Sequence, residues 1–451
     1  MTAGAQASAA RANIWQMSLT EWLICAIACV GFAFDTYTLL VLTLIVRPAL
    51  NEMLPANAGA GIFNHWVGIL FYVPAIAGGV FGLLGGYLID LVGRRRILAW
   101  SILLYGVCTF ATAYVTSPMQ FLLLRCGTFI GVSVEFVAAT AWLAELFTQR
   151  EQREAIIGIT QAFASTGGLL ISSVYYLAVT YSQRLPLIHG KHQAWRYAAM
   201  SGLIPAIPLI LLRPFLPESP VWKRKKAEGT LKRPSFAELF RPSFRKTALI
   251  TCLMMACSYG GSFGMLQHFA RIIPGTPGIR VLSVEAQERQ VGWLQGVQEM
   301  GGLAGRFLMA FLAVHILSRR RLLRLFQIPA LVLIPVVMFL PAVWDRDMST
   351  AGIFALGLLT VAQFSYWGNY LPLVYPTYLR GTGEAFAANI GGRMLGTSAA
   401  LLVTSMVQFM PGGSASRQLA YAAGIVGLLS YVVGFVASFW LPEPSLEATP
   451  D

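Results

Sequence analysis

The sequence predicts an all-α membrane protein of twelve transmembrane helices in two six-helix bundles. Three observations lead to this prediction. Of the 451 residues, 56% are hydrophobic and only 12% are charged, and the mean hydropathy is +0.63, so most of the chain must be surrounded by lipid. Twelve apolar runs alternate with short loops. One long polar interval divides these runs into six and six.

The apolar runs follow one another with few interruptions, and several exceed the roughly 20 residues that a straight span needs, so we expect tilted spans. The runs lie near residues 21–46, 65–89, 96–115, 119–147, 155–181, 196–216, 247–273, 290–316, 322–344, 349–375, 382–410 and 418–441. The predicted parts are an N-terminal tail (1–20), a six-helix bundle (21–216), a linker (217–246), a second six-helix bundle (247–441) and a C-terminal tail (442–451).

The chain is strongly basic, with 33 Lys and Arg against 20 Asp and Glu. A basic balance can indicate nucleic-acid binding, but here the basic residues form short clusters between apolar runs, which is the pattern that sets membrane orientation. The clusters Arg94–Arg96 and Arg319–Arg321 fall on the same side as the linker. We therefore expect a multi-pass protein of the cytoplasmic (inner) membrane with both termini in the cytoplasm, and no nucleic-acid partner.

The loop after the second apolar run carries a narrow order of residues, Gly86-Tyr-Leu-Ile-Asp-Leu-Val-Gly-Arg-Arg-Arg96. A basic loop between two membrane helices does not require this order. Aligning Arg94–Arg96 with Arg319–Arg321 places His315 opposite Asp90, so a degenerate copy follows the second span of the other half. Two repeated halves with a substrate site between them, near the midplane, are typical of secondary transporters.

This loop resembles the signature loop of the major facilitator superfamily, and further stretches are similar to that family. Arg125 to Glu135 in span 4 resembles a run of proton-coupled carboxylate symporters of the lactate and sialate type, with three of its glycines replaced. Pro217–Pro220 resembles the Pro-Glu-Ser-Pro that follows span 6 in sugar and organic-ion carriers. In span 11, Asn389 and Arg393 resemble the Asn and Arg of another family run.

The resemblance implies transport by alternating access and a set of gating residues, which are Gly86, Asp90, Gly93, Arg94, Arg95, Glu145, Arg153 and Arg380. Asp90 is expected to cap the positive N-terminus of span 11 from the other half, and His315 in the second copy would make this latch asymmetric. Span 7 lacks the paired glutamines of sugar porters, which weakens a sugar substrate. Leu373 stands where span 10 usually carries a glutamate.

Charged residues inside the apolar runs need a partner, a water-filled cavity or a function, because burying a charge in hydrocarbon costs at least about 2.5 kcal/mol. Asp35 in span 1 and Arg125 in span 4 lie at similar distances from the external ends of their runs, so we expect them to pair and to act as a proton switch. The alternative is a permanent structural ion pair. Glu135 is either a second proton site or a bond to a neighbouring helix.

A planar guanidinium in the membrane can donate two parallel hydrogen bonds to one carboxylate. Arg393, one turn from Asn389, is therefore the first candidate ligand for an anionic substrate, and Arg306 is the second. The alternative is that Glu299 neutralises one of them permanently. Weaker candidates for the cavity lining, which are equally consistent with packing, are Gln161, Gln267, Gln363, Trp367 and Tyr370.

The sequence contains no nucleophile–base pair, metal cluster or phosphate-binding loop, so we expect no enzyme activity, no metal and no cofactor, with protons as the coupling ion. We expect proton-coupled symport of a small organic anion, in a lipid bilayer, by a protein that functions as a monomer. The alternatives are a proton-driven exporter of amphipathic compounds, a sugar or polyol symporter, and a membrane sensor that transports nothing.

Overall fold

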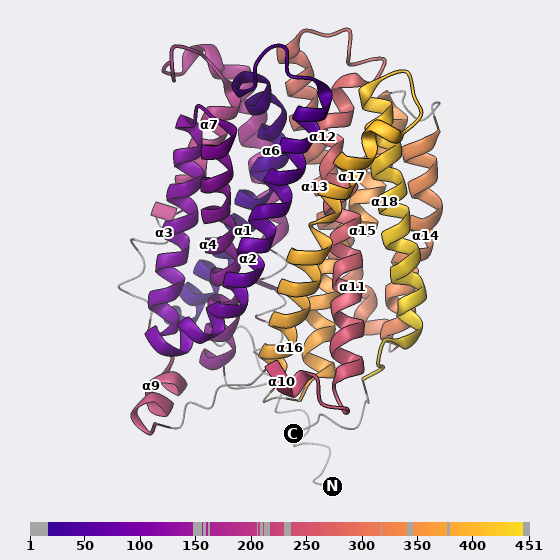
Figure 1. Cartoon of the computed structure of the whole chain (residues 1–451). Helices are drawn as coiled ribbons and strands as arrows, with labels where there is room; N and C mark the ends of the chain where they lie inside the picture. The colour runs from indigo at the N-terminus through magenta and orange to yellow at the C-terminus, as the bar shows by residue number, and fades with distance from the viewer. Residues whose placement is uncertain are drawn as a thin grey trace.

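The fold is a bundle of long helices whose two halves lie side by side (Figure 1). The computed structural model describes residues 17–147, 156, 159–160, 163–204, 206–207, 211, 217–229, 236–316, 318–340, 346–376 and 379–444. Within these ranges, nine helices are long and apolar enough to cross a membrane. We call the side of the bundle where the first helix begins and the last one ends the terminal side, and the opposite side the far side.

The first four helices of the N-terminal half are continuous over most of their predicted runs. They are α1 (Leu19–Met53), α2 (Ala60–Val92), α3 (Arg94–Ala111), α4 (Pro118–Leu146), α6 (Ala164–Tyr181) and α7 (Ala194–Met200). Two short helices, α9 (Pro220–Ala227) and α10 (Phe236–Leu239), lie on the terminal side between the halves of the sequence (Figure 1). Because α1 is 35 residues long, it extends well past the apolar run from which it was predicted.

The helices of the C-terminal half are more often interrupted. They are α11 (Arg245–Phe263), α12 (Phe269–Ile272), α13 (Val284–His315), α14 (Arg319–Phe339), α15 (Arg346–Val374), α16 (Arg380–Phe386), the π-helix η9 (Ala387–Gly396), α17 (Ala399–Met406) and α18 (Ala415–Ala437). Span 7 was predicted as continuous but breaks into 3-10 turns after α11, and span 11 widens into a π-helix at its centre. Such widened turns are frequent at functional sites.

Serine side chains fix where several of the helices begin. Ser18 accepts a hydrogen bond from the backbone N–H of Glu21, and the Glu21 carboxylate bonds back to the backbone of Ser18, which forms a capping box. Ser117 caps α4, Ser283 caps α13 and Ser414 caps α18 through the N–H three residues later. These polar caps satisfy backbone donors at helix ends that lipid could not.

The two halves meet along two seams. In one seam, α2 packs against η9 and α17, and Gly82 lets the Asn389 side chain lie against the α2 backbone. In the other, α6 packs against α13, and Gly168 faces the carboxyl group of Glu299. A Cβ atom at either glycine would overlap the facing side chain, so close approach of the helices requires glycine there.

Each half closes its signature loop with a carboxylate from the segment that follows its sixth span. Glu218 accepts hydrogen bonds from the backbone N–H groups of Arg94 and Arg95 at the start of α3, at 3.1 and 3.2 Å. The loop turns at Gly93, whose φ of 108° is a conformation that favours glycine. The carboxylate therefore caps a positive helix N-terminus on the terminal side.

The same cap recurs in the second half at a constant spacing of 225 residues. Glu443 accepts bonds from the backbone N–H groups of Arg319 and Arg320, at 2.9 and 3.0 Å, and from the Ser318 hydroxyl at 2.7 Å. Because Glu443 lies 225 residues after Glu218, as Arg319 does after Arg94, the two caps are copies of one device.

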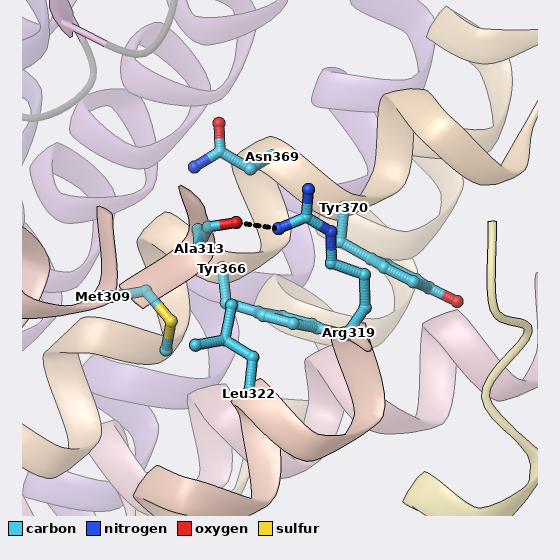
Figure 2. A pocket seen from close by; sticks show the side chains of 7 residues that line it. All are labelled: Met309, Ala313, Arg319, Leu322, Tyr366, Asn369 and Tyr370. Atoms are coloured by element: carbon cyan, nitrogen blue, oxygen red, sulfur yellow. Dashed lines mark hydrogen bonds between the residues drawn. The ribbon is translucent and has the colours of Figure 1, made fainter. Parts of the chain in front are cut away.

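One ion pair of the first loop is missing from the second copy. Arg94 donates to Glu145 at 2.7 Å, whereas the position 225 residues after Glu145 holds Tyr370. Figure 2 shows the small pocket at this place, where Arg319 lies beside the ring of Tyr370 and donates to the Ala313 carbonyl oxygen at 3.2 Å. Arg94 also donates to the Ile89 carbonyl oxygen at 3.3 Å, so both loops have a cap and a bond to the backbone, and the first has the ion pair with Glu145 in addition.

We predict that Glu218→Ala lowers the free energy of unfolding by about 1–2 kcal/mol, because it removes the acceptor for two backbone N–H groups. The midpoint of thermal unfolding in detergent measures the effect. Glu228→Ala, which removes an exposed carboxylate that pairs with Arg224 at 4.0 Å, is the matched control and should change the midpoint little. Equal midpoints for the two variants would contradict the cap.

Candidate functional site

Two carboxyl groups of the N-terminal half lie together inside the bundle. Asp35 of α1 and Glu135 of α4 are 6% and 1% exposed, and their side chains are close enough to share a hydrogen bond. Asp35 Oδ1 and Glu135 Oε2 accept no hydrogen bond from any residue that the structure describes. The buried hydroxyl of Tyr105 in α3 lies next to Glu135. Two buried carboxylates at this separation repel each other unless a proton lies between them.

A guanidinium from the C-terminal half faces this carboxyl pair. Arg393 lies in η9, donates from Nη1 to Asn389 Oδ1 at 2.7 Å, and stands 5.4 Å from the centre of the Phe136 ring of α4. Its charge acts on Asp35, although the two side chains are not within the 4.0 Å of a direct ion pair. Asn389 and Arg393 therefore lie together, as predicted, with their side chains at the seam between the halves.

The predicted pair of Asp35 and Arg125 is wrong for this structure. Arg125 donates from its two Nη atoms to the backbone carbonyl oxygens of Thr38 and Leu39, each at 2.6 Å, and lies over the Phe129 ring. The Arg125 guanidinium meets α1 about one turn after Asp35, where the two carbonyl oxygens satisfy it. The Glu135 carboxyl group lies against Gly31, about one turn before Asp35, and is the side chain that contacts Asp35.

A second buried polar group lies on α13. Glu299 Oε1 accepts hydrogen bonds from the side-chain amides of Gln295 and Gln298, at 2.9 and 3.1 Å. Arg306 lies within electrostatic range of Glu299 and of Tyr259. The expectation that Glu299 neutralises an arginine is thus consistent with Arg306 as its counter-charge.

The halves are joined on the far side by polar contacts between side chains. Glu288 of α13 accepts from Arg47 of α1 at 2.7 Å and from the hydroxyl of Tyr175 of α6 at 2.5 Å. Thr43 of α1 donates to Gln267 at 2.6 Å, so this predicted substrate ligand lies in the contact between the halves. Arg271 donates to Asn64 of α2 at 2.5 Å. These contacts close the far side in this conformation.

The predicted stripe of span 10 is bonded within the C-terminal half. Gln363 accepts from Ser258 and donates to the Tyr431 hydroxyl, and Trp367 donates to Ser258 at 2.8 Å. Tyr370 is fully buried and donates to the Pro442 carbonyl oxygen at 2.6 Å. All three side chains thus have internal partners, as the packing interpretation expects.

Several predicted residues lie outside what the structure describes. These are Gln161 and Arg153, together with the surroundings of Gly86 and the side chain of Asp90, so the proposed contact of Asp90 with span 11 stays a prediction. Arg380 is half-buried at the start of α16.

Other residues near the site were not predicted from the sequence. Tyr105, Gln295 and Gln298 belong to no recognisable motif. The ion pair of Arg47 and Glu288 carried a weak signal, because both residues lie near the ends of apolar runs on one side.

The comparison with known proteins agrees with this arrangement. The model of the Major Facilitator Superfamily matches residues 23–401, which is most of the chain. The chain belongs to the major facilitator superfamily. It is therefore a multi-pass membrane transporter and not an enzyme, and the predicted fold of two six-helix bundles is confirmed.

Its relatives carry small metabolites. A probable 4-methylmuconolactone transporter of Cupriavidus pinatubonensis is 24% identical over 92% of this chain and 88% of that protein. A cis,cis-muconate transport protein of Acinetobacter baylyi is 24% identical over 80% of this chain and 82% of its own length. A sialic acid transporter of Escherichia coli is 21% identical over 90% and 92%. Among solved structures, a D-xylose-proton symporter shares the fold with a TM-score of 0.73 at 18% identity, over 94% of this chain and 99% of that one.

We predict that Glu288→Gln shifts the resting population toward conformations that are open on the far side, because Arg47 loses its counter-charge across the seam. Spin labels at the exposed positions Asn57 and Arg280, in a background without native cysteines, would report a longer distance. Glu52→Gln breaks ion pairs within one half only and should leave the distance unchanged. Unaltered distances in Glu288→Gln would contradict the predicted closure.

Proposed function

We propose that the protein is a secondary active transporter that takes up a small organic anion together with a proton by alternating access. The observation that supports this proposal is the juxtaposition of two carboxyl groups, Asp35 and Glu135, with one guanidinium, Arg393, across the seam between the halves. Relatives that transport muconate and sialic acid favour an acidic substrate.

The carboxyl pair would carry the proton. Asp35 and Glu135 are too buried and too close for both to be ionised without a neighbouring positive charge. Without substrate, Arg393 supplies part of that charge from the other half. Because this positive charge faces the two acids, the pair binds a proton less tightly than it would without Arg393.

The substrate would bind the Arg393 guanidinium, which faces the carboxyl pair. A carboxylate that takes the free edge of the Arg393 guanidinium neutralises it, since Asn389 occupies only one Nη atom. The carboxyl pair then loses its positive neighbour and binds a proton more tightly. Substrate and proton therefore bind cooperatively, and each raises the affinity for the other by the same factor.

The proton gradient would set the direction of transport across the membrane. The basic loops that begin at Arg94 and Arg319 lie on the terminal side, which we assign to the cytoplasm by the distribution of positive charge. A monocarboxylate moving with one proton crosses without net charge. The proton gradient alone would then drive uptake of such a substrate.

We predict that Asp35→Asn abolishes uphill uptake driven by a pH gradient while exchange of substrate across the membrane continues, because the neutral amide no longer takes up and releases a proton. Proteoliposomes loaded with a carboxylate chosen by thermal-shift screening would measure both activities. Glu285→Gln, which changes an exposed acid at the start of α13, should transport normally. Normal accumulation in Asp35→Asn would disprove the proton role.

We predict that Arg393→Lys weakens the affinity for the carboxylate at least about tenfold, because an ammonium group cannot offer two parallel hydrogen bonds. Equilibrium binding to the purified protein measures this change. Arg417→Lys, an exposed change near the start of α18, is the control. Unchanged affinity in Arg393→Lys would remove the anion site and favour the exporter of amphipathic compounds, which needs no such arginine.

A further inference from the structure

The polar group on α13 is not used by the proton and carboxylate mechanism. Glu299, Gln295 and Gln298 are 3%, 2% and 0% exposed, in a helix that packs against the other half. Both amides turn their NH₂ groups toward Glu299 Oε1, which accepts a hydrogen bond from each. Their carbonyl oxygens consequently point elsewhere.

These carbonyl oxygens need donors. Neither Gln295 Oε1 nor Gln298 Oε1 has a hydrogen-bond partner among the described residues. The same holds for the hydroxyl of Ser165, which is 1% exposed and lies one turn before Gly168 on α6. A buried polar atom without a partner is costly in a bundle surrounded by lipid. Three such oxygens on the two helices of one seam indicate a site that a ligand completes.

The polar group on α13, formed by Glu299, Gln295 and Gln298, lies at the level of the carboxyl pair of Asp35 and Glu135. Gly167 of α6 packs against the backbone of Ala33, two residues before Asp35, while the adjacent Gly168 faces the carboxyl group of Glu299. The ring of Tyr259 packs on η9 at Gly392, next to Arg393, and Tyr259 lies within electrostatic range of Arg306 on α13. Tyr259 therefore links the surroundings of Arg393 with α13.

The charges around the α13 group limit what it can bind. A second carboxylate is disfavoured, because Glu299 and the amide oxygens only offer acceptors. A cation is disfavoured by Arg306, whose charge already balances Glu299. Neutral O–H donors remain, and they match the acceptors without adding charge.

We propose that Gln295, Gln298 and Ser165 form a subsite for the hydroxyl groups of the substrate, so that the transporter selects hydroxylated organic acids over acids of the same length without hydroxyl groups. This inference rests on the proposed carboxylate transport and adds the identity of the substrate class. A site built to hydrogen-bond hydroxyl groups discriminates strongly, because an analogue without them leaves buried polar atoms unpaired.

Matched pairs of acids test the proposal by equilibrium binding to the purified protein. The pairs are glycerate with propionate and gluconate with hexanoate, which differ only in hydroxyl groups. We expect the hydroxylated member of at least one pair to bind tenfold or more tightly than its partner. In Gln295→Met and in Gln298→Met, affinity for that hydroxylated acid should fall about tenfold while affinity for its partner stays within twofold.

Gln327→Met is the control variant. Gln327 is also a buried amide whose oxygen has no partner among the described residues, but it lies between α14 and α18, away from the seams. Its substitution should leave the preference unchanged, and the same loss as in Gln295→Met would overturn the subsite. The subsite is also overturned if the wild type binds both members of each pair equally, or if the α13 variants weaken both alike. Binding of no acid by the wild type would overturn the carboxylate proposal and the subsite together.

Discussion

The electrostatic balance across the seam governs the arrangement of this transporter. Inside the N-terminal half, Asp35 and Glu135 bring two acidic groups together, and Arg125 of the same half is bonded to backbone oxygens instead. Inside the C-terminal half, Glu299 lies within electrostatic range of Arg306, and Arg393 lies beside Asn389 at the seam. The attraction between Arg393 and Asp35 therefore crosses the seam. In the proposed mechanism, a proton and an anionic substrate take its place.

The internal repeat explains which parts of the two halves are alike and which differ. The caps formed by Glu218 and Glu443 are retained at the same spacing, because each satisfies backbone donors at a helix N-terminus. The residues that make the site are not repeated, since the positions 225 residues after Asp35 and Glu135 hold Gly260 and Thr360. Structure is thus conserved across the repeat while the chemistry is divided between the halves.

Much of the fold could be predicted from the sequence, because apolar runs of sufficient length must become spanning helices. The pairing of Asn389 with Arg393 could be predicted too, since residues one turn apart share a helix face. The partner of Asp35 could not, because Arg125 bonds to the backbone carbonyl oxygens of Thr38 and Leu39, and backbone acceptors leave no pattern in the sequence. The π-helix that carries Arg393 leaves no clear trace in residue spacing.

The bonds of Arg125 have a consequence for how the transporter moves. Arg125 of α4 donates hydrogen bonds to the carbonyl oxygens of Thr38 and Leu39, and these bonds join α4 to α1 one turn away from Asp35. Asp35 and Glu135 are therefore carried by two helices that are bonded to each other. In the proposed symport, a proton shared by these acids would not be released by separating them. Its release would follow from the approach and departure of Arg393 on the opposite half, so the movement between the halves would itself control protonation.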